Sequence, residues 1–375
     1  MNQKLSNFDS AQERNTYLEK KLKIRLSHIK KAAFPETEKV FCENIIGATS
    51  IPLGVAGPIH IKGSQMEDDY YIPLATTEGA LVASVSRGGK AVSLSGGILT
   101  AVETVGATRA PVFEVEHINE ALEFKKWIHD NFLFLQKESG KTSNHIKLLK
   151  SEVSTTGRYV YVRFYFDCDQ AMGMNMATIA TEKMVQVIKK ETKISCVSIS
   201  GNYCVDKKPA WLNFISGRGR KVWAEAVIKQ DVIKKVLKTT PKELYEVWLL
   251  KCLMGSVISG SMGFNAHFAN IVAAFYLATG QDLAHVVEGS LGVTTVKVLP
   301  SGDLYFSVYL PAVMLGVVGG GTRLQIKKEA ISITKVTSSD ALAQVLAGAV
   351  LAGELSLLAS LQEGSLAEAH ASLGR

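Results

Sequence analysis

The feature that most restricts the folds open to this chain lies between residues 110 and 200, where strand and helix patterns follow one another in a definite order. Four segments have the β-branched and aromatic residues typical of short strands: 111–116, 146–153, 159–167 and 195–200. Two segments repeat apolar residues at intervals of three and four, as helices with one buried face do: 118–136 and 172–190. This β-α-β-β-α-β order predicts a ferredoxin-like unit.

The chain before this unit predicts helices at two places. Residues 1–40 favour one or two polar helices, of which 11–31 is the clearest. Further on, Thr76 or Thr77 is a predicted N-cap, which places Glu78 in the first turn of a helix that the Gly88-Gly89 pair should end.

The chain after the unit predicts a mixture of helices and strands. Helical patterns cover 242–256, 265–277 and 339–361, and strand patterns cover 293–310. We therefore predict an α+β protein in three parts. The parts are a small helical segment (1–40), a large mixed α/β domain (41–109 and 201–375) and the inserted ferredoxin-like domain (110–200).

Length and composition favour several domains and argue against some functions. A chain of 375 residues with 47% hydrophobic residues exceeds what one core usually holds. The net charge of +7 comes with only 21% charged residues, and the basic cluster at 20–31 also carries apolar residues at helical spacing. We therefore expect a solvated helix face there and no nucleic-acid binding.

Cysteine usage and apolar runs bear on the location of the protein. The five cysteines are scattered without a CxxC pair, so we expect reduced thiols, no metal site and a cytoplasmic protein. The first residues have no apolar segment, and Asn265 and Glu354 are among the residues that interrupt the later apolar runs. We expect neither a signal peptide nor a membrane span.

Four side chains suit proton transfer or oxyanion stabilisation, and each also has a structural interpretation. Glu78 is either a helix-stabilising acid or a proton donor. Lys207 is either an exposed surface lysine or a cation that Asp206 keeps charged for an oxyanion. Asp282 is either a helix N-terminal acid or a catalytic one, and His370 is either a surface residue or a group that closes over a site.

Two segments with small residues suit close approach to a ligand. Residues 171–176, AMGMNM, lie between a predicted strand and helix and can bind a pyrophosphate at the helix start, although methionines there are also typical of a core. The glycines 319–321 permit the same approach or form a plain turn.

Nine segments, taken in order, resemble those of one enzyme family. They are ENIIG (43–47), PLGVAGP (52–58), TTEGALVAS (76–84), AMGMNM (171–176), SGNYCVDKKPA (200–210), GFNAHFANIV (263–272), GQD (280–282), VVGGGT (317–322) and AGELSLLASL (352–361). From about residue 40 to its end the chain is similar to 3-hydroxy-3-methylglutaryl-coenzyme A (HMG-CoA) reductases. The terminal Gly374-Arg375 resembles the class used in biosynthesis.

The resemblance implies a reaction and a catalytic set. The family reduces the thioester of HMG-CoA to the alcohol mevalonate, through a hemithioacetal and an aldehyde, with two reduced nicotinamides in succession. By position, Lys207 would stabilise the carbonyl oxyanion, Asp282 would hold and tune Lys207, Glu78 would supply protons, and His370 would protonate the departing CoA thiolate.

The resemblance also implies binding residues. Positions that grip the hydroxymethylglutaryl part are matched by Arg109, Ser200, Asn202, Asp206, Lys208 and Asn270. Positions near CoA are matched by Ser84, Arg87 and Lys251. Cofactor positions correspond to Ser143, Asn144, Gln170, Met172, Gly173, Met174, Asn175, Thr322 and Arg375.

Two of the cofactor positions depart from the family pattern. Gln170 replaces the usual aspartate, and Asn144 replaces a basic residue that often follows Ser143. NADPH remains the expected cofactor because Arg375 is retained, and NADH stays open as an alternative.

The family's architecture implies a homo-oligomer, a dimer or a dimer of dimers, because its active site lies between subunits. In this architecture the large domain binds HMG-CoA and the inserted domain binds the nicotinamide cofactor. Two rival interpretations remain. They are a family member that oxidises mevalonate in the reverse direction, and a CoA- or nucleotide-binding module without catalysis.

Overall fold

The computed structural model describes residues 5–28, 42–64 and 66–364, and places ten strands among them in one continuous sheet. The strands are β1 (Leu53–Gly63), β2 (Met66–Ala75), β3 (Ile98–Arg109), β4 (Val112–Glu114), β5 (Lys147–Thr156), β6 (Tyr159–Asp167), β7 (Ser195–Ser198), β8 (Gly219–Ile228), β9 (Val293–Val298) and β10 (Leu304–Val313). The predicted α+β class is confirmed.

The ferredoxin-like order read from the sequence is present in the structure. The strands lie in the order β7-β4-β6-β5, and all of these neighbours pair antiparallel. The first helical connection is α4 (Ile118–Asp130) with α5 (Phe132–Gly140), and the second is α6 (Met174–Thr192). The single helix predicted over 118–136 is therefore two helices, since Asn131 ends the first and begins the second.

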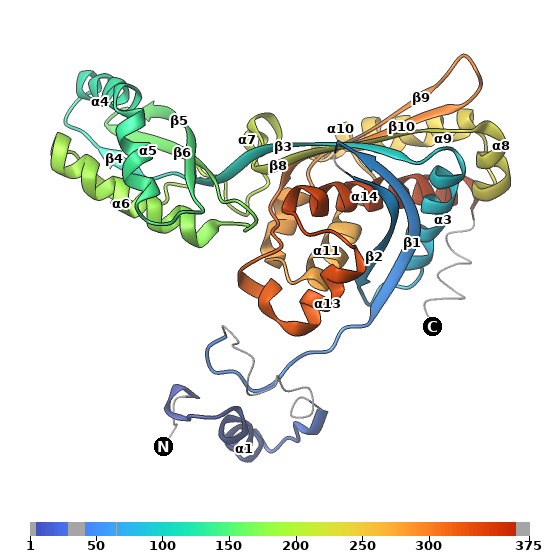
Figure 1. Cartoon of the computed structure of the whole chain (residues 1–375), viewed down its shortest axis with the longest axis horizontal. Helices are drawn as coiled ribbons and strands as arrows, with labels where there is room; N and C mark the ends of the chain where they lie inside the picture. The colour runs from blue at the N-terminus through green and yellow to red at the C-terminus, as the bar shows by residue number, and fades with distance from the viewer. Residues whose placement is uncertain (1–4, 29–41, 65, 365–375) are drawn as a thin grey trace.

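The larger body is built on β1, β3, β8, β10 and β9, with the hairpin strand β2 at its edge. Its central helix is α14 (Ser339–Glu363), which packs on β3, β8 and β10 and against α3 (Leu81–Leu94). Figure 1 shows this body on the right, the ferredoxin-like unit on the left, and β3 running from one to the other. The last residues of β3 pair with β6, so this strand belongs to both parts.

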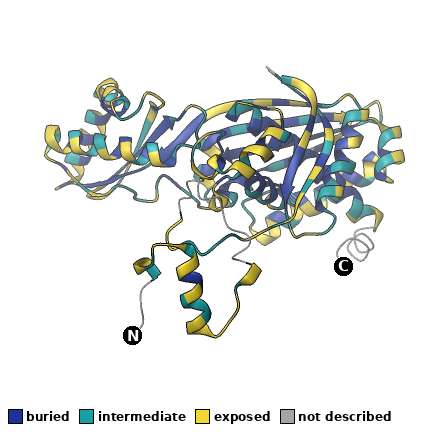
Figure 2. Ribbon diagram, turned by 60° about the horizontal axis from the view of Figure 1, so that its bottom comes forward, coloured by how far each residue is buried: buried dark blue, intermediate teal, exposed yellow. Residues whose placement is uncertain are grey.

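Helix α14 is long and apolar enough to cross a membrane, but the fold uses it differently. In its most apolar window, 89% of the helix is buried inside the protein. Figure 2 shows buried residues along the strands of both parts, whereas α1 (Ala11–Leu22) carries mostly exposed and intermediate residues. The apolar composition of α14 is thus explained by its place in the core.

The remaining helical elements differ in length and position, and the longest of them, α11, packs into the core of the larger body. They are η1 (Leu5–Asn7), α7 (Trp211–Ser216), α8 (Gln230–Val232), η2 (Ile233–Leu237), α9 (Pro241–Trp248), η3 (Leu249–Gly255), α10 (Ser256–Ser259), α11 (Phe268–Thr279), η4 (Leu283–His285), α12 (Val286–Gly289), η5 (Gly320–Arg323) and α13 (Gln325–Ile333).

Buried apolar residues form two clusters. One contains residues of β1, β2, α3, β8, α11, β10 and α14, and the other contains residues 107–194 with Met314. These clusters support the division into 1–40, 41–109 with 201–375, and 110–200, which we keep as a proposal.

The helix predicted over 11–31 ends earlier, at Leu22, because Lys23 adopts a left-handed conformation and its N–H bonds to the Glu19 carbonyl.

The prediction for the Thr76 helix was wrong at both ends. Helix α3 begins at Leu81 after Ala80, whose φ of 69° is left-handed, and Glu78 lies in the preceding turn, where its N–H bonds to Thr76 Oγ1. The helix also continues past Gly88 to Leu94. It needs a glycine there because a Cβ on Gly88 would stand 1.8 Å from the carbonyl oxygen of Ala352 on α14.

Replacing Gly88 by Ala should destabilise the protein. The added methyl group collides with backbone, which cannot rotate away, so we expect a loss of about 2–3 kcal/mol in the free energy of unfolding by urea. Gly140→Ala is the matched control, since nothing lies within 4 Å of its Cβ position. Equal stability of the two variants would contradict the close approach of α3 and α14.

Candidate active site

A cavity of about 1050 Å³ opens where the ferredoxin-like unit meets the larger body. It is lined by Arg109 at the end of β3, by residues 168–176 before and within the start of α6, and by Asp206 and Lys207. From the larger body it is lined by residues 280–282, 316–323 and Lys328. With His145, which also lines it, residues from seven separate stretches of the sequence meet here.

The polar centre of this cavity is an ion pair between Lys207 and Asp282. Lys207 Nζ lies 2.8 Å from Asp282 Oδ2, and each side chain is 38% exposed. Asp282 also caps η4 by accepting a hydrogen bond from the N–H of Ala284. The pair therefore presents a held ammonium group to a space large enough for a ligand.

The pKa of Asp282 lies below its ordinary value. Burial raises it, but the hydrogen bond from Lys207, the N–H of Ala284 and the charge of His285 together outweigh burial. The carboxylate thus stays ionised beside Lys207 at neutral pH.

The segment that carries Lys207 has an unusual backbone. Asn202, Val205 and Lys207 all have left-handed φ angles, of 61°, 50° and 56°. Asparagine tolerates this region, but a β-branched valine does not favour it. Asn213 helps to hold the segment, because its Nδ2 donates to the carbonyl oxygens of Val205 and Lys208.

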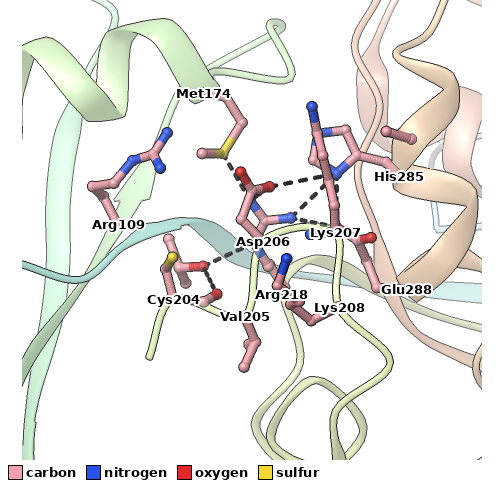
Figure 3. A network of polar contacts seen from close by, with 12 residues as sticks. Arg109, Met174, Cys204, Val205, Asp206, Lys207, Lys208, Arg218, His285 and Glu288 are labelled. Atoms are coloured by element: carbon pink, nitrogen blue, oxygen red, sulfur yellow. Dashed lines mark hydrogen bonds and ion pairs between the residues drawn. The ribbon is translucent and has the colours of Figure 1, made fainter. Parts of the chain in front are cut away.

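Behind the ion pair lies a buried charged cluster (Figure 3). Arg218, fully buried, donates to Asp206 Oδ1 at 2.8 Å and to Glu288 Oε1 at 2.5 Å. His285, also buried, lies 2.7 Å from Glu288 Oε1 through Nδ1. Lys207 joins the cluster through its backbone N–H, 3.4 Å from the same Glu288 oxygen.

Arg218, His285 and Glu288 were not among the site residues predicted from the sequence. The oxygen and nitrogen atoms of Asp206, His285 and Glu288 lie within 4.8 Å of one another, a spacing that can also hold a metal ion. Here the guanidinium group of Arg218 contacts both carboxylates and supplies the positive charge. The available sequence signal was the spacing of three from Asp282 to His285 and from His285 to Glu288, which puts successive residues on one helix face.

The predicted cofactor segments lie side by side in the same cavity. Ala171 pairs with Val318, and the N–H of Val317 bonds to the Gln170 carbonyl. A Cβ on Gly316 would stand 2.4 Å from the backbone nitrogen of Met172, which explains why a glycine occurs there. The cavity-lining residues from the predicted cofactor set are Gln170, Met172, Gly173, Met174, Asn175 and Thr322.

Gln170 and the Ser143-Asn144 turn show how the two departures from the family pattern are accommodated. The Gln170 side chain accepts hydrogen bonds from the backbone N–H and the hydroxyl of Ser339, so it holds the start of α14. After Ser143 and Asn144, it is His145 that lines the cavity, with Nδ1 3.0 Å from Asp169 Oδ2.

Glu78 is bonded to Asn270, a residue of a second cavity and not of the one that contains Lys207 and Asp282. Asn270 Nδ2 is 3.1 and 2.8 Å from the two carboxylate oxygens of Glu78. Asn270 is in the first turn of α11 and lines another cavity, of about 670 Å³, together with Pro209 and His267. Asp282 follows the other end of α11, a helix of 12 residues, so about 18 Å separates the two ends.

The wall of this second cavity is fastened to the core by Glu354 of α14. Its buried carboxylate accepts the backbone N–H groups of Ala266 and His267, at 2.8 and 2.6 Å. It also accepts the Thr294 hydroxyl at 2.7 Å. A polar residue that interrupts an apolar helix thus positions the residues just before α11.

The predicted CoA residues Ser84 and Arg87 lie on α3 against α14. Ser84 Oγ is 3.0 Å from Ser356 Oγ, and Arg87 donates to the hydroxyl and carbonyl of the same Ser356. Lys251 is exposed on η3. These three residues lie on elements other than those that carry Lys207 and Asp282.

Of the other residues predicted to bind the substrate, Ser200, Asn202 and Lys208 are close to Lys207 in the sequence, and Arg109 lines the same cavity. Arg109 lines the first cavity and donates to Thr178 Oγ1, while Ser200 lies 3.5 Å from Cys204 Sγ. Asn202 and Lys208 are exposed on the loop. His370 and Arg375 lie outside the described residues.

Comparison with solved structures shows a related fold. A class II HMG-CoA reductase from Streptococcus pneumoniae, whose structure is described as bound to NADPH in open conformations, matches with a TM-score of 0.70. The match covers 95% of this chain and 98% of that one, at 18% identity.

Sequence comparison gives a nearer relationship. The chain is 46% identical to a 3-hydroxy-3-methylglutaryl-coenzyme A reductase of Methanothermobacter thermautotrophicus, over 96% of this chain and 92% of that protein. It is also 46% identical to the protein of the same name from Pyrococcus abyssi, with the same coverage. The model of the hydroxymethylglutaryl-coenzyme A reductase family matches residues 10–375, and the chain therefore belongs to this family.

Proposed function

We propose that this protein reduces HMG-CoA to mevalonate and free CoA with two molecules of NADPH. The observation that carries the proposal is the Lys207–Asp282 ion pair, which faces a cavity shared by both parts of a chain of this family. NADPH, when bound, supplies the two hydrides. The overall reaction consumes two protons besides, one for the alcohol oxygen and one for the CoA thiolate.

Lys207 is the oxyanion-stabilising group. Negative charge develops on the same carbonyl oxygen in both reduction steps, and a preorganised ammonium group lowers the free energy of both transition states. Asp282, kept ionised, holds Lys207 charged and in place. Glu78 supplies the proton for the oxygen, and His370 protonates the thiolate that leaves when the hemithioacetal carbon–sulfur bond breaks.

The cavity suits a phosphorylated nucleotide. Residues 171–175 reach it at the start of α6, where free backbone N–H groups attract phosphate. Besides Arg109 and Lys207, the basic side chains that line it are His145, Arg323 and Lys328. The NADPH-bound neighbour supports NADPH as the cofactor, and NADH is the alternative to test.

We further propose that two subunits share the active site. Within one chain Glu78 is held by Asn270 at the opposite end of α11 from Asp282, so a second copy must bring a Glu78 to Lys207. Consecutive elements η3 and α10 expose Leu250, Met254, Val257 and Ile258, an apolar face of the kind that subunit interfaces bury. A cytoplasmic location is part of the same proposal and is supported by the free cysteines and the buried α14.

The activity is tested by following nicotinamide absorbance with purified protein, HMG-CoA, and NADPH or NADH. We expect HMG-CoA-dependent oxidation of NADPH, with a higher kcat/KM than for NADH. Lys207→Ala should lower kcat at least about 100-fold, because it removes the oxyanion donor. Lys251→Ala, at a position that resembles a CoA contact and not a contact to the reacting carbonyl, should leave kcat near the wild-type value and change only the KM for HMG-CoA. No oxidation with either cofactor would refute the proposed function.

The shared site is tested by mixing inactive subunits. Glu78→Gln and Lys207→Ala proteins, each inactive alone, are unfolded and refolded together. In a dimer with shared sites, half the mixed dimers' sites are intact, so roughly a quarter of the wild-type activity should return. Refolding of each variant alone is the control. Absence of recovery, with mixed dimers verified by mass, would show that both residues act from one chain.

A further inference from the structure

His285 stands directly behind the Lys207–Asp282 pair and lines neither of the two cavities. Its side chain has no exposed surface, so it does not meet a ligand. Nε2 of its ring lies 3.7 Å from Asp282 Oδ2, the same oxygen that contacts Lys207 Nζ. The imidazole therefore faces the carboxylate from the side opposite the cavity.

The other ring nitrogen determines how the imidazole is oriented. Nδ1 lies 2.7 Å from Glu288 Oε1, and a carboxylate only accepts hydrogen bonds, so Nδ1 carries a proton. Among the described residues Nε2 has no hydrogen-bond partner. A buried, unpaired ring nitrogen is costly to leave without an interaction, and the nearest charged atom in its direction is Asp282 Oδ2.

Glu288 is in turn held from three sides. Arg218 Nη1 lies 2.5 Å from its Oε1, the backbone N–H of Lys207 lies 3.4 Å from it, and His285 is the third contact. Glu288 thus touches the backbone of the catalytic lysine while His285 faces the catalytic aspartate. The two buried side chains connect both members of the ion pair to one rigid cluster.

We propose that His285, oriented by Glu288, is a positioning residue for the reduction: it fixes the Asp282 carboxylate and, through it, the Lys207 ammonium group. The proposal rests on the proposed function for its kinetic consequences. The charged groups that face His285 are Asp206 at 3.8 Å and Arg218 at 3.3 Å, besides Asp282 and Glu288. The ring therefore lies among three carboxylates and one guanidinium group.

The proposal predicts a change in the pH profile. The charge of His285 is one of the causes that lower the pKa of Asp282. When His285 is replaced by a neutral residue, the pKa of Asp282 should rise, and the carboxylate should lose its charge at a higher pH. The acidic limb of the kcat profile should therefore move to higher pH.

Two variants separate the two ring nitrogens. The amide of His285→Asn can occupy the position of Nδ1 and keep the Glu288 contact, whereas that of His285→Gln reaches the position of Nε2 and can still bond to Asp282. We expect His285→Asn to lower kcat up to about 100-fold, with KM values within about twofold of wild type, because a reacting group loses its orientation. His285→Gln should regain much of kcat. His60→Asn, at a half-buried histidine of β1 that pairs with Asp69 of β2, is the matched control and should resemble wild type.

A second measurement does not depend on catalysis. In protein labelled with ¹³C-histidine, the ring signal of His285, assigned by its loss in His285→Asn, should shift in Asp282→Asn and remain in place in Asp69→Asn. If the wild-type protein fails to oxidise NADPH, the proposed function is refuted. The ring signal of His285 then tests the contact between His285 and Asp282 by itself. Equal loss of kcat in the Asn and Gln variants, with an unmoved acidic limb, would overturn the positioning role. A His285 ring signal that does not shift in Asp282→Asn would also overturn the positioning role.

Discussion

The buried guanidinium group of Arg218 is the interaction on which the arrangement of the site depends. A fully buried cation is stable only when its donors are paired, and this one is paired to groups from distant parts of the chain. Thr108 comes from β3, Asp206 from the loop that carries Lys207, and Glu288 from α12. Met174 at the start of α6 adds a fourth contact, through its sulfur. Removing Asp206 or Glu288 would leave part of the guanidinium charge uncompensated, and removing Thr108 would leave a buried N–H without its acceptor, so these elements keep one relative position.

The central helix α14 has a similar role for the larger body. Its apolar length forms the core under the sheet, and some of its polar residues bond to the elements around the site. Glu354 holds the residues just before α11, and Ser356 contacts Ser84 and Arg87 on α3. At its amino-terminal end Ser339 bonds to Gln170 of the ferredoxin-like unit. One helix thus connects the second cavity, the α3 residues and the cofactor segment, and Gly88 permits the close approach that this requires.

Much of the fold was readable from local pattern, and the errors have a common cause. The apolar spacing in α4 and α6 reports burial of one helix face, and the β-branched and aromatic residues of β6 predicted a strand, although β6 is buried on both faces, Arg163 and Tyr165 included. Both signals depend only on residues that are neighbours in the sequence. The start of α3 was misplaced because Thr76 forms a local turn with Glu78 instead of capping the helix. The continuation of α3 past Gly88 depends on Ala352, more than 250 residues away. Sequence pattern contains no information on such contacts.

The sequence by itself determined the family, the order of elements in the inserted unit, and the residues Glu78, Lys207 and Asp282 as candidates, because collinear segments and periodicity are properties of the chain. Only the tertiary structure decided which of them meet. It places Lys207 against Asp282, keeps Glu78 with Asn270 at the far end of α11, and turns Gln170 toward Ser339. It also revealed His285, Glu288 and Arg218 behind the ion pair. The physical reason is that a charged side chain can be buried only where the fold brings a hydrogen-bonding or oppositely charged partner next to it. The local sequence pattern does not encode the distance between residues that are far apart in the chain.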